Sequence, residues 1–348
     1  AYPPLAGIEA FHTSTRDWLA RRFNIHPDFL AQLETPLPLC GTREGLFLAA
    51  QITPKKTHHK RDGFIGMPNP FYQLYATAAV AAAATPLYLA AQKQNNFMPD
   101  LTALDDDTLA QLRGFYLCNP ANPQGASASR AYLRTAYDLA KKHNFLLLVD
   151  ECYSDIYDTT PPLSMLEIMA EANDDDAPVL VFHSLSKRSN LAGLRSGFAL
   201  GGRTAHQRFH QLRLIAGTQS PVPTQRAAAA AWADDDHVIE NRALYRQKLD
   251  MAEKILGEQF DFYRPAGGFF LWLNVGDVAN DGESFTKTLW RHYGVRVLPG
   301  AYLMADDSPS YSSMSDATNY IRVALVASLH ETEQSLQALC QAAQKVAA

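Results

Sequence analysis

A lysine that follows a buried strand is the first candidate for chemistry in this sequence. Val179 to Phe182 is an unbroken apolar run, typical of a strand in a parallel sheet that is covered on both faces. Ser184, Ser186 and Lys187 follow it directly. Open α/β sheets bind ligands beyond the carboxyl ends of such strands. A lysine there can lose solvation, which lowers its pKa and lets its amine attack an aldehyde. Alone, such a lysine is more often part of a basic surface turn.

A carboxylate ends the preceding strand of the sequence. The run from Phe145 to Val149 is apolar, and Asp150 follows it, with Tyr153 a few residues later. Burying a carboxylate is costly unless it meets a cation. A helix cap or an ion pair with a core arginine would explain Asp150 alone. Beside a lysine at the end of the next strand, a cationic ring nitrogen of a ligand becomes the better partner, and Tyr153 could donate to a ring oxygen.

Other polar residues lie where a phosphate or a flat ring could bind. Gly41-Thr42-Arg43 predicts a turn that opens a helix, and a helix N-terminus binds phosphate, although any capped helix looks similar. Arg195, shortly after the lysine, is a fixed cation suited to a phosphate. Tyr72 could stack on a flat ligand or could simply be packed. Asn122 stands in a rigid turn that contains two Asn-Pro pairs.

An arginine stands in the middle of a predicted strand near the carboxyl end of the chain. Arg322 lies between apolar residues in the run 320–325, where burial of its charge costs free energy. Either a substrate carboxylate or a structural salt bridge would satisfy its two-pronged guanidinium.

Taken together, these residues suit one kind of cofactor. An aldehyde cofactor needs a lysine for covalent attachment, an anion beside its pyridinium nitrogen, donors to its ring oxygen and a cup for its phosphate. The residues that supply these in turn are Lys187, Asp150, Asn122 with Tyr153, and Arg195 with Ser184, Ser186, Thr42 and Arg43.

The elements that must position these residues alternate between strand and helix over most of the chain. Helices are expected at 8–23, 75–84, 130–143, 204–215 and 225–232, and strands at 64–67, 87–89, 115–118, 145–149, 179–182 and 197–201. A long helix at 236–257 then leads to shorter, mixed elements. The pattern predicts a large α/β domain with a mostly parallel sheet at 1–235 and a smaller α+β domain at 236–348.

Composition narrows the class of protein. Of 348 residues, 47% are apolar and 19% charged, which is ordinary for an enzyme with a large core. The net charge of −5 gives no electrostatic case for nucleic acid or an anionic membrane, and no apolar run is long enough to span a bilayer. The cysteines lack paired or metal-type spacing, so we expect a reduced, cytoplasmic setting and no metal site.

The order of the motifs resembles the fold-type I, class I/II pyridoxal-phosphate aminotransferases over essentially the whole chain. The matching motifs are Gly41-Thr-Arg-Glu, Asn69-Pro-Phe-Tyr, Asn119-Pro-x-Asn-Pro-x-Gly, Asp150-Glu-x-Tyr, Ser184-x-Ser-Lys with Arg195, and Ile321-Arg-Val. Within that family, the longer strings 68–75, 150–157, 181–190 and 297–302 resemble the proteobacterial N-succinyl-L,L-diaminopimelate aminotransferases of lysine biosynthesis.

The resemblance implies pyridoxal 5′-phosphate as cofactor and a role for each residue. Lys187 would hold the cofactor covalently and move the proton, and Asp150 would keep the ring nitrogen protonated. The resemblance implies that Tyr153 and Asn122 bind the ring oxygen of the cofactor and that Tyr72 stacks on its ring. The phosphate would be bound by Thr42, Arg43, Ser184, Ser186 and Arg195, and the substrate α-carboxylate by Arg322 with Asn122. Tyr2 resembles a tyrosine that reaches the phosphate of a partner subunit, which implies a homodimer with shared active sites.

Two departures from the family pattern stand out. Gln124 replaces the usual threonine, and an N-terminal segment that closes over the substrate is expected but missing from this sequence. Candidates for reading the remainder of the substrate are Arg43, Arg188 and the segment 302–320. The alternatives are an aminotransferase for aspartate, aromatic amino acids or acetylornithine, and a β-lyase on the same scaffold. A regulator domain is the alternative from another class, but nothing basic or helix-turn-helix-like precedes Tyr2.

Overall fold

A seven-stranded sheet forms the centre of the larger part of the chain. The structure, a computed structural model, describes residues 2–56, 63–279, 281–305 and 316–347. The strand order is β1-β7-β6-β5-β4-β2-β3. The strands are β1 (Leu37–Leu39), β2 (Phe64–Asn69), β3 (Thr85–Ala90), β4 (Leu112–Cys118), β5 (Leu146–Asp150), β6 (Val179–Ser184) and β7 (Gly197–Gly201).

The strands that carry the predicted site residues run parallel to one another. Strands β2 to β6 pair in parallel, whereas β7 runs antiparallel to β6 and β1 antiparallel to β7. Asp150 ends β5 and Ser184 ends β6, so both residues emerge at one edge of the sheet. The mostly parallel sheet expected from the apolar runs is therefore confirmed.

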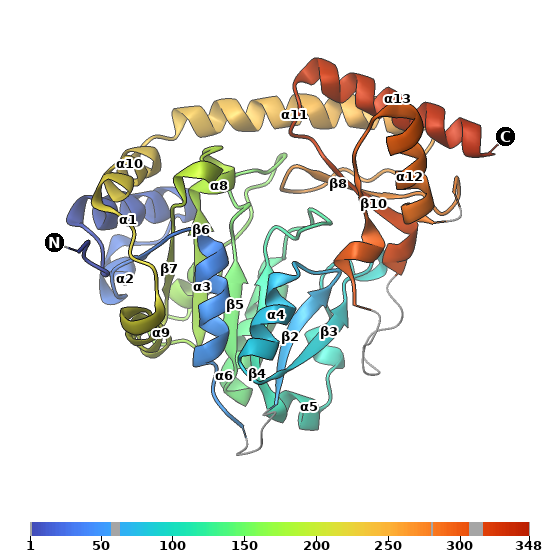
Figure 1. Cartoon of the computed structure of the whole chain (residues 1–348). Helices are drawn as coiled ribbons and strands as arrows, with labels where there is room; N and C mark the ends of the chain where they lie inside the picture. Colours follow the sequence, from blue (N-terminus) through green and yellow to red (C-terminus); the bar gives the residue numbers. More distant parts are fainter. Residues whose placement is uncertain (1, 57–62, 280, 306–315, 348) are drawn as a thin grey trace.

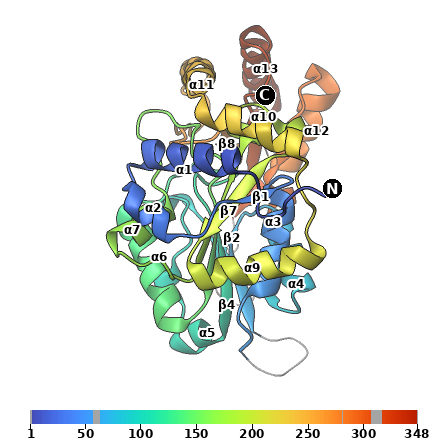
Figure 2. The same ribbon diagram turned by 90° about the vertical axis from the view of Figure 1, so that its left-hand side faces the viewer.

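Helices cover both faces of this sheet (Figure 2). One face packs against α6 (Arg130–His143) and α7 (Met165–Glu171), and the other against α3 (Thr42–Ala49), α4 (Leu74–Ala81) and α9 (Arg203–Ala216). The remaining helices of this part are α1 (Glu9–Phe23), α2 (Pro27–Gln32), α5 (Asp106–Gln111), α8 (Leu185–Arg188) and α10 (Val222–Ala233).

The central strands divide their side chains between two apolar cores. Leu147 and Val149 of β5 enter the core shared with α6 and α7, whereas Leu146 and Leu148 enter the core shared with α3 and α4. This alternation follows from the two-residue period of a strand. It explains why the runs at 145–149 and 179–182 are apolar at every position.

A second, three-stranded antiparallel sheet lies toward the carboxyl end, with the order β8 (Phe270–Asn274), β10 (Tyr320–Ala324), β9 (Leu298–Pro299). The long helix α11 (Asp236–Leu256) runs from α10 to this part of the molecule, where α12 (Gly282–Tyr293) and α13 (Leu329–Ala347) also lie (Figure 1). Its residues Leu249 and Leu256 join a separate apolar core with Ile321. A domain boundary at residue 235 stays a prediction.

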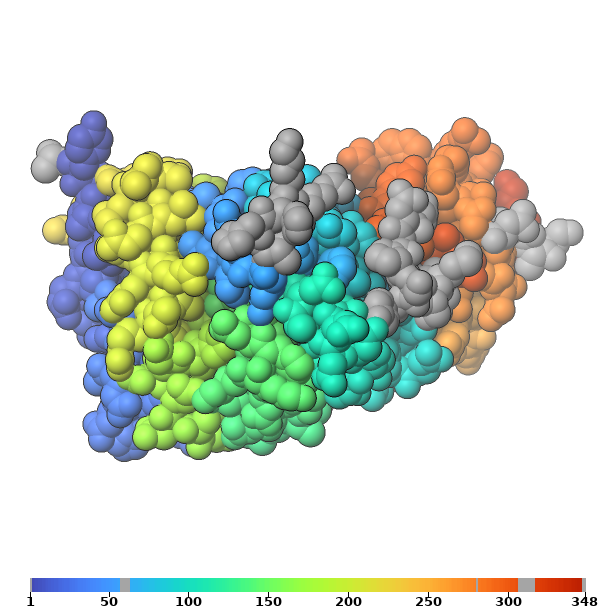
Figure 3. Space-filling model, turned by 90° about the horizontal axis from the view of Figure 1, so that it is seen from below, coloured from blue at the N-terminus to red at the C-terminus, as the bar shows by residue number. Residues whose placement is uncertain are grey.

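The molecule is elongated, with N-terminal and C-terminal elements at opposite ends (Figures 1 and 3). Several element boundaries differ from expectation by up to three residues, and two of them have a clear local cause. The helix expected from residue 225 begins at Val222, because Pro223 fits a first helical turn, where its missing N–H is not needed. The alanine-rich helix expected to reach residue 84 ends at Ala81, and Ala83 has a left-handed backbone with φ 54°. No helix in the described ranges is long and apolar enough to cross a membrane.

Trp18 gives a stability prediction. Its ring is 1% exposed, and its centre lies 4.5 Å from Trp232 of α10 and 6.0 Å from Phe198 of β7. Trp18→Ala should therefore lower the free energy of unfolding by about 3–5 kcal/mol. Trp290 of α12 is 52% exposed, so Trp290→Ala should cost less than about 1 kcal/mol. Chemical denaturation measures both changes, and equal losses would contradict this account of the core.

Candidate active site

A cavity of about 510 Å³ lies where the carboxyl ends of β5 and β6 meet the second sheet. The second sheet contributes Phe270, Leu298 and Arg322 to its wall. Tyr2 lies outside the cavity and is 92% exposed. All other site residues expected from the sequence line it: Thr42, Arg43, Tyr72, Asn122, Asp150, Tyr153, Ser184, Ser186, Lys187, Arg195 and Arg322.

Lys187 is held in the short helix α8, just past the end of β6. The Ser184 hydroxyl accepts a hydrogen bond from the Ser186 N–H at 3.1 Å and so caps this turn. Burial lowers the pKa of Lys187, the Arg322 guanidinium lowers it further, and Asp150 opposes the shift. A lowered pKa makes the neutral amine more available, and this is the form that attacks an aldehyde or removes a proton.

Asp150 is a buried carboxylate with hydrogen bonds on both of its oxygens. Oδ2 accepts from the Tyr75 hydroxyl at 2.8 Å, and Oδ1 accepts from the Cys152 N–H at 3.2 Å. Burial raises the pKa of Asp150, whereas the bonds from Cys152 and Tyr75 lower it. In the described part of the chain, no lysine or arginine forms an ion pair with Asp150. The carboxylate therefore suits a cationic ring nitrogen in the cavity.

Arg322 lies at the middle of β10, as its sequence position predicts. Its Nη1 donates to Asn122 Oδ1 at 3.0 Å, and its guanidinium carbon lies 4.5 Å from the centre of the Phe270 ring. Among the described residues it has no carboxylate partner, so the guanidinium remains able to bind a substrate carboxylate. The Asn122 amide oxygen is occupied by Arg322, which leaves its NH₂ group to donate to a ligand. Gln124 is buried and does not line the cavity.

The opposite end of the cavity can hold an anion. Thr42 is the first residue of α3, and the Gly41 before it has φ +87°. A side chain on Gly41 would collide with the Arg195 guanidinium, so glycine leaves the room that this arginine occupies. Arg195 donates only to the carbonyl oxygens of Ala192 and Cys40 among the described residues, at 3.0 and 3.2 Å.

Two serine hydroxyls complete this anion cradle. The Oγ atoms of Ser184 and Ser186 lie 3.0 Å apart. A helix N-terminus, these hydroxyls and a guanidinium that has no carboxylate partner in the described ranges form a fitting set of donors for a phosphate. The lysine, the buried carboxylate and the cradle therefore fit pyridoxal 5′-phosphate.

The three candidates for binding the remainder of the substrate differ in their exposure and in their contacts. Arg43 is exposed at the cavity, and its Nε donates to the Tyr72 hydroxyl at 2.8 Å. Arg188 is excluded because it is 2% exposed and its guanidinium lies 2.9 Å from Asp155 and 2.6 Å from Asp235. Of the segment 302–320, residues 306–315 lie outside the described residues.

Sequence reasoning missed three kinds of contact around this cavity. Tyr75 bonds Asp150, the Thr42 hydroxyl lies 3.1 Å from the Cys152 sulfur, and the Lys187 amine lies 5.0 Å from the centre of the Phe269 ring. Only Tyr75 had a signal, since it follows Tyr72 at helical spacing in the string that carries the family motif. The others depend on segments that are distant in sequence.

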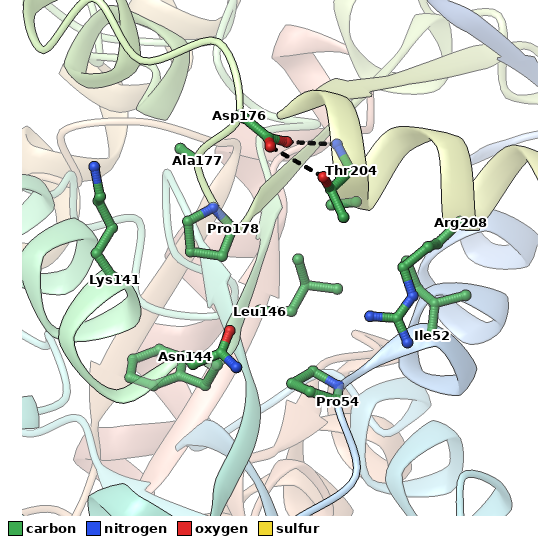
Figure 4. A pocket seen from close by; sticks show the side chains of 12 residues that line it. Ile52, Pro54, Lys141, Asn144, Leu146, Asp176, Ala177, Pro178, Thr204 and Arg208 are labelled. Atoms are coloured by element: carbon green, nitrogen blue, oxygen red, sulfur yellow. Dashed lines mark hydrogen bonds between the residues drawn. The ribbon is translucent and has the colours of Figure 1, made fainter.

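A second cavity, of about 320 Å³, lies near the amino ends of β5 and β6 (Figure 4). Its charged groups are mostly paired already. The Asp176 carboxylate accepts from the Thr204 N–H and hydroxyl, and the Lys141 amine donates to Asp174. Although Arg208 turns toward this cavity in Figure 4, no buried lysine and carboxylate meet there. The candidate catalytic groups of the described residues therefore lie in the cavity at the carboxyl edge.

Comparison with known proteins identifies extensive similarity. The model of the family described as aminotransferase class I and II matches residues 1–342. An LL-diaminopimelate aminotransferase of Dehalococcoides mccartyi is 28% identical over 97% of this chain and 82% of its own length. One of Desulforudis audaxviator is 30% identical over 86% of this chain and 74% of its own length.

Solved structures agree in fold. An aminotransferase from Neisseria meningitidis superposes with a TM-score of 0.88 and 32% identity, covering 98% of this chain and 84% of that one. A probable N-succinyldiaminopimelate aminotransferase from Thermus thermophilus gives a TM-score of 0.80 and 24% identity, covering 96% and 84%. The likeness to the Thermus protein shows the fold alone.

The charges around Lys187 predict how its reactivity changes with pH. A nearby cation disfavours the protonated amine, so Arg322→Gln should raise the pKa of Lys187. A nearby anion favours it, so Asp150→Asn should lower that pKa. The apoprotein would be treated with a small neutral aldehyde and a reductant, and the labelled Lys187 peptide quantified by mass spectrometry across pH. The half-maximal rate should move to higher pH in Arg322→Gln and to lower pH in Asp150→Asn.

Exposed Lys254 of α11 provides an internal control, since its labelling should be the same in all variants. Shifts of Lys187 in the same direction in both variants would contradict the arrangement of charges described above.

Proposed function

Because this chain belongs to the aminotransferase class I and II family, whose members use pyridoxal phosphate, we propose that it exchanges an amino group between N-succinyl-L,L-diaminopimelate and 2-oxoglutarate. That the chain is a pyridoxal-phosphate-dependent aminotransferase follows from the family itself. The substrate and the role of each residue are the proposal, with diaminopimelate and lysine biosynthesis as its setting.

The observation that carries the proposal is the pair of arginines at different depths of one cavity. Arg322 is partly buried, has no carboxylate partner among the described residues and shares the cavity with Lys187. Arg43 is exposed and is held by Tyr72 at the cavity wall. A donor with a carboxylate at its reacting centre and another further along its chain would satisfy both. Diaminopimelate and its succinyl derivative have this pattern of charge.

The chain supplies the groups that transamination needs. Bound pyridoxal phosphate would supply an aldehyde that accepts the amino group and a ring that withdraws electrons from the reacting carbon. The Lys187 amine removes the proton from the α-carbon of the donor, for which its lowered pKa suits it. Arg322 binds the α-carboxylate and so fixes which bonds of that carbon face the lysine. Asp150 places a negative charge opposite the ring nitrogen.

Other residues hold the ligand in place. Asn122 and Tyr153 would donate to the ring oxygen of the bound cofactor, and Tyr72 would pack against its ring. The phosphate would be bound by Thr42, Ser184, Ser186 and Arg195. The role that we propose for Arg43 is to bind the distal carboxylate of the substrate. Burial raises the pKa of Tyr153 well above its ordinary value, so its hydroxyl stays protonated and able to donate.

Two observations support a diaminopimelate-type donor. The curated relatives named LL-diaminopimelate aminotransferases match most of this chain at 28–30% identity. The sequence strings at 68–75 and 150–157 resemble those of the N-succinyl-L,L-diaminopimelate aminotransferases. Free LL-diaminopimelate is the second candidate, since it is the donor that the relatives' names give. The biosynthetic role and the four free cysteines support a cytoplasmic enzyme.

We also propose that two copies share their active sites. Tyr2 is almost fully exposed and does not line the cavity of its own chain, so a phosphate that it reaches would belong to a second copy. Exposed Leu214 and Ile215 at the end of α9 offer apolar surface for such contact.

A donor panel tests the substrate. Starting from the cofactor-loaded enzyme, N-succinyl-L,L-diaminopimelate, LL-diaminopimelate, N-acetylornithine, aspartate and glutamate are added separately without an oxo acid. The visible absorption of the lysine-bound cofactor should fade rapidly with the succinylated donor and with glutamate, the product of the proposed exchange. It should fade at least about tenfold more slowly with N-acetylornithine, which has no second carboxylate, and with aspartate, whose second carboxylate is too close to its reacting carbon to reach Arg43. The rate with free LL-diaminopimelate decides between the two candidate donors. Stopped-flow absorbance measures each rate.

The other outcomes are equally informative. Faster fading with free LL-diaminopimelate would replace the proposed donor, equal fading with aspartate would indicate a general aminotransferase, and release of pyruvate would indicate a β-lyase. As a matched pair, Arg43→Gln should raise KM for the succinylated donor at least about tenfold, whereas Arg43→Lys, which keeps the charge, should raise it less.

A mixing experiment tests the shared site. Lys187→Ala and Tyr2→Ala should each have low activity alone, the first losing at least about 100-fold because it lacks the catalytic amine. After the two variants are mixed and exchanged, a hybrid dimer would contain one site with wild-type Lys187 and wild-type Tyr2. Activity should therefore rise well above the sum of the separate variants. Activity equal to that sum, with dimers verified by sedimentation, would show that Tyr2 does not act across subunits.

A further inference from the structure

Tyr75 is a buried tyrosine that points its hydroxyl at the carboxylate of the candidate site. It lies in the first turns of α4 and is 1% exposed. Its hydroxyl donates to Asp150 Oδ2 at 2.8 Å, while the Cys152 N–H binds the other oxygen at 3.2 Å. These two donors therefore restrict the rotation of a carboxylate that β5 would otherwise leave free at its end.

The ring of Tyr75 is itself fixed by two other tyrosines. It stacks on Tyr116 of β4 with ring centres 4.4 Å apart and planes 8° apart, and it meets Tyr72 edge to face at 5.6 Å. The Tyr116 hydroxyl donates to the Leu46 carbonyl oxygen at 2.7 Å. The position of the Tyr75 hydroxyl is thus set by the stacked ring of Tyr116 on β4, and not by its own helix alone.

The protonation of the pair has a definite direction. Burial and the Asp150 charge raise the pKa of Tyr75 well above its ordinary value, so the tyrosine keeps its proton and donates. The same bond lowers the pKa of Asp150 and opposes the effect of burial on that carboxyl. A hydrogen bond to a charged group is stronger than one between neutral groups. Tyr75 therefore favours the ionised carboxylate over the neutral acid.

We propose that Tyr75 is a positioning residue for the reaction, which holds Asp150 as an oriented anion opposite the ring nitrogen of the cofactor. This inference rests on the role proposed above for Asp150. Tyr75 does not line the cavity. Its hydroxyl acts through Asp150, and its ring supports Tyr72, which does line the cavity.

Tyr75→Phe separates these two contributions, because it removes the hydroxyl and keeps the ring between Tyr72 and Tyr116. We expect kcat to fall by roughly 10- to 100-fold, the range for a lost hydrogen bond to a charged group, with little change in KM for the amino donor. The affinity of the apoprotein for pyridoxal 5′-phosphate, measured by fluorescence titration, should fall by at least about tenfold. The pH dependence of the bound cofactor's absorption should shift as well.

Tyr116→Phe is the matched control. It removes a buried hydroxyl from the neighbouring ring of the same stack, but that hydroxyl binds a backbone carbonyl and not Asp150. Its effect on the melting temperature should be similar to that of Tyr75→Phe, whereas kcat, cofactor affinity and the absorption profile should stay near those of the parent. Equal catalytic losses in the two variants would overturn the proposal, because both would then reflect loosened packing.

A double-mutant cycle with Asp150→Asn shows whether Tyr75 acts through Asp150. If it does, Tyr75→Phe should have a much smaller effect in the Asp150→Asn background than in the parent. An undiminished effect would refute the inference. A loss in Asp150→Asn with no loss in Tyr75→Phe would refute the inference alone. No loss in Asp150→Asn would instead refute the role proposed for Asp150.

Discussion

The structure depends on keeping two opposite charges out of water at the ends of neighbouring strands. Asp150 ends β5, and Lys187 stands just past the end of β6, which pairs with β5 in parallel. Burial pushes both groups toward their neutral forms, since it raises the pKa of Asp150 and lowers the pKa of Lys187. The proposed role of Asp150 needs the ionised carboxylate, so the effect of burial on it must be opposed. The proposed role of Lys187 needs the neutral amine, which burial favours. The hydrogen bonds from Cys152 and Tyr75 lower the pKa of Asp150 and so oppose the effect of burial. The nearby Arg322 lowers the pKa of Lys187 and so adds to the effect of burial.

An ion-pair network next to Asp150 and Lys187 holds the segments that carry them in place. Asp155, shortly after Asp150, pairs with Arg22 of α1 at 2.8 Å and with Arg188 at 2.9 Å. Arg188 also pairs with Asp235 at the start of α11, and it directly follows Lys187. Removing one member of such a buried network leaves an uncompensated charge, which is strongly destabilising. The segments that carry Asp150 and Lys187 are therefore tied to each other, to α1 and to the helix that leads to the second sheet.

The residues that line the cavity can be predicted from the sequence more completely than the contacts that surround them. Asp150, Ser184 and Lys187 each follow an apolar strand, and parallel strands end at one edge, so their meeting follows from local patterns and one topological rule. The sheet expected from those apolar runs is present, and Arg322 does stand mid-strand. The helical spacing from Tyr72 points to Tyr75, but its bond to Asp150 could not be predicted, because that bond depends on how α4 packs over β4. The burial of Arg188 could not be predicted for a related reason: a basic residue beside Lys187 is expected to be exposed, and only the placement of α10 and α11 covers it.

The two arginines of the cavity differ in environment, and this difference bears on specificity. Arg322 is partly buried over Phe270 and fixed by Asn122, so a ligand that fails to offer it a carboxylate leaves a desolvated cation without a partner. Arg43 is exposed and can return to water at little cost. Under the roles proposed for Arg322 and Arg43, recognition of the α-carboxylate should thus be strict, whereas recognition of the distal carboxylate can tolerate variation in chain length and substituent. Under the proposed function, such a site could serve a succinylated or a free diaminopimelate after few changes near Arg43, without disturbing the buried charges of Asp150 and Lys187.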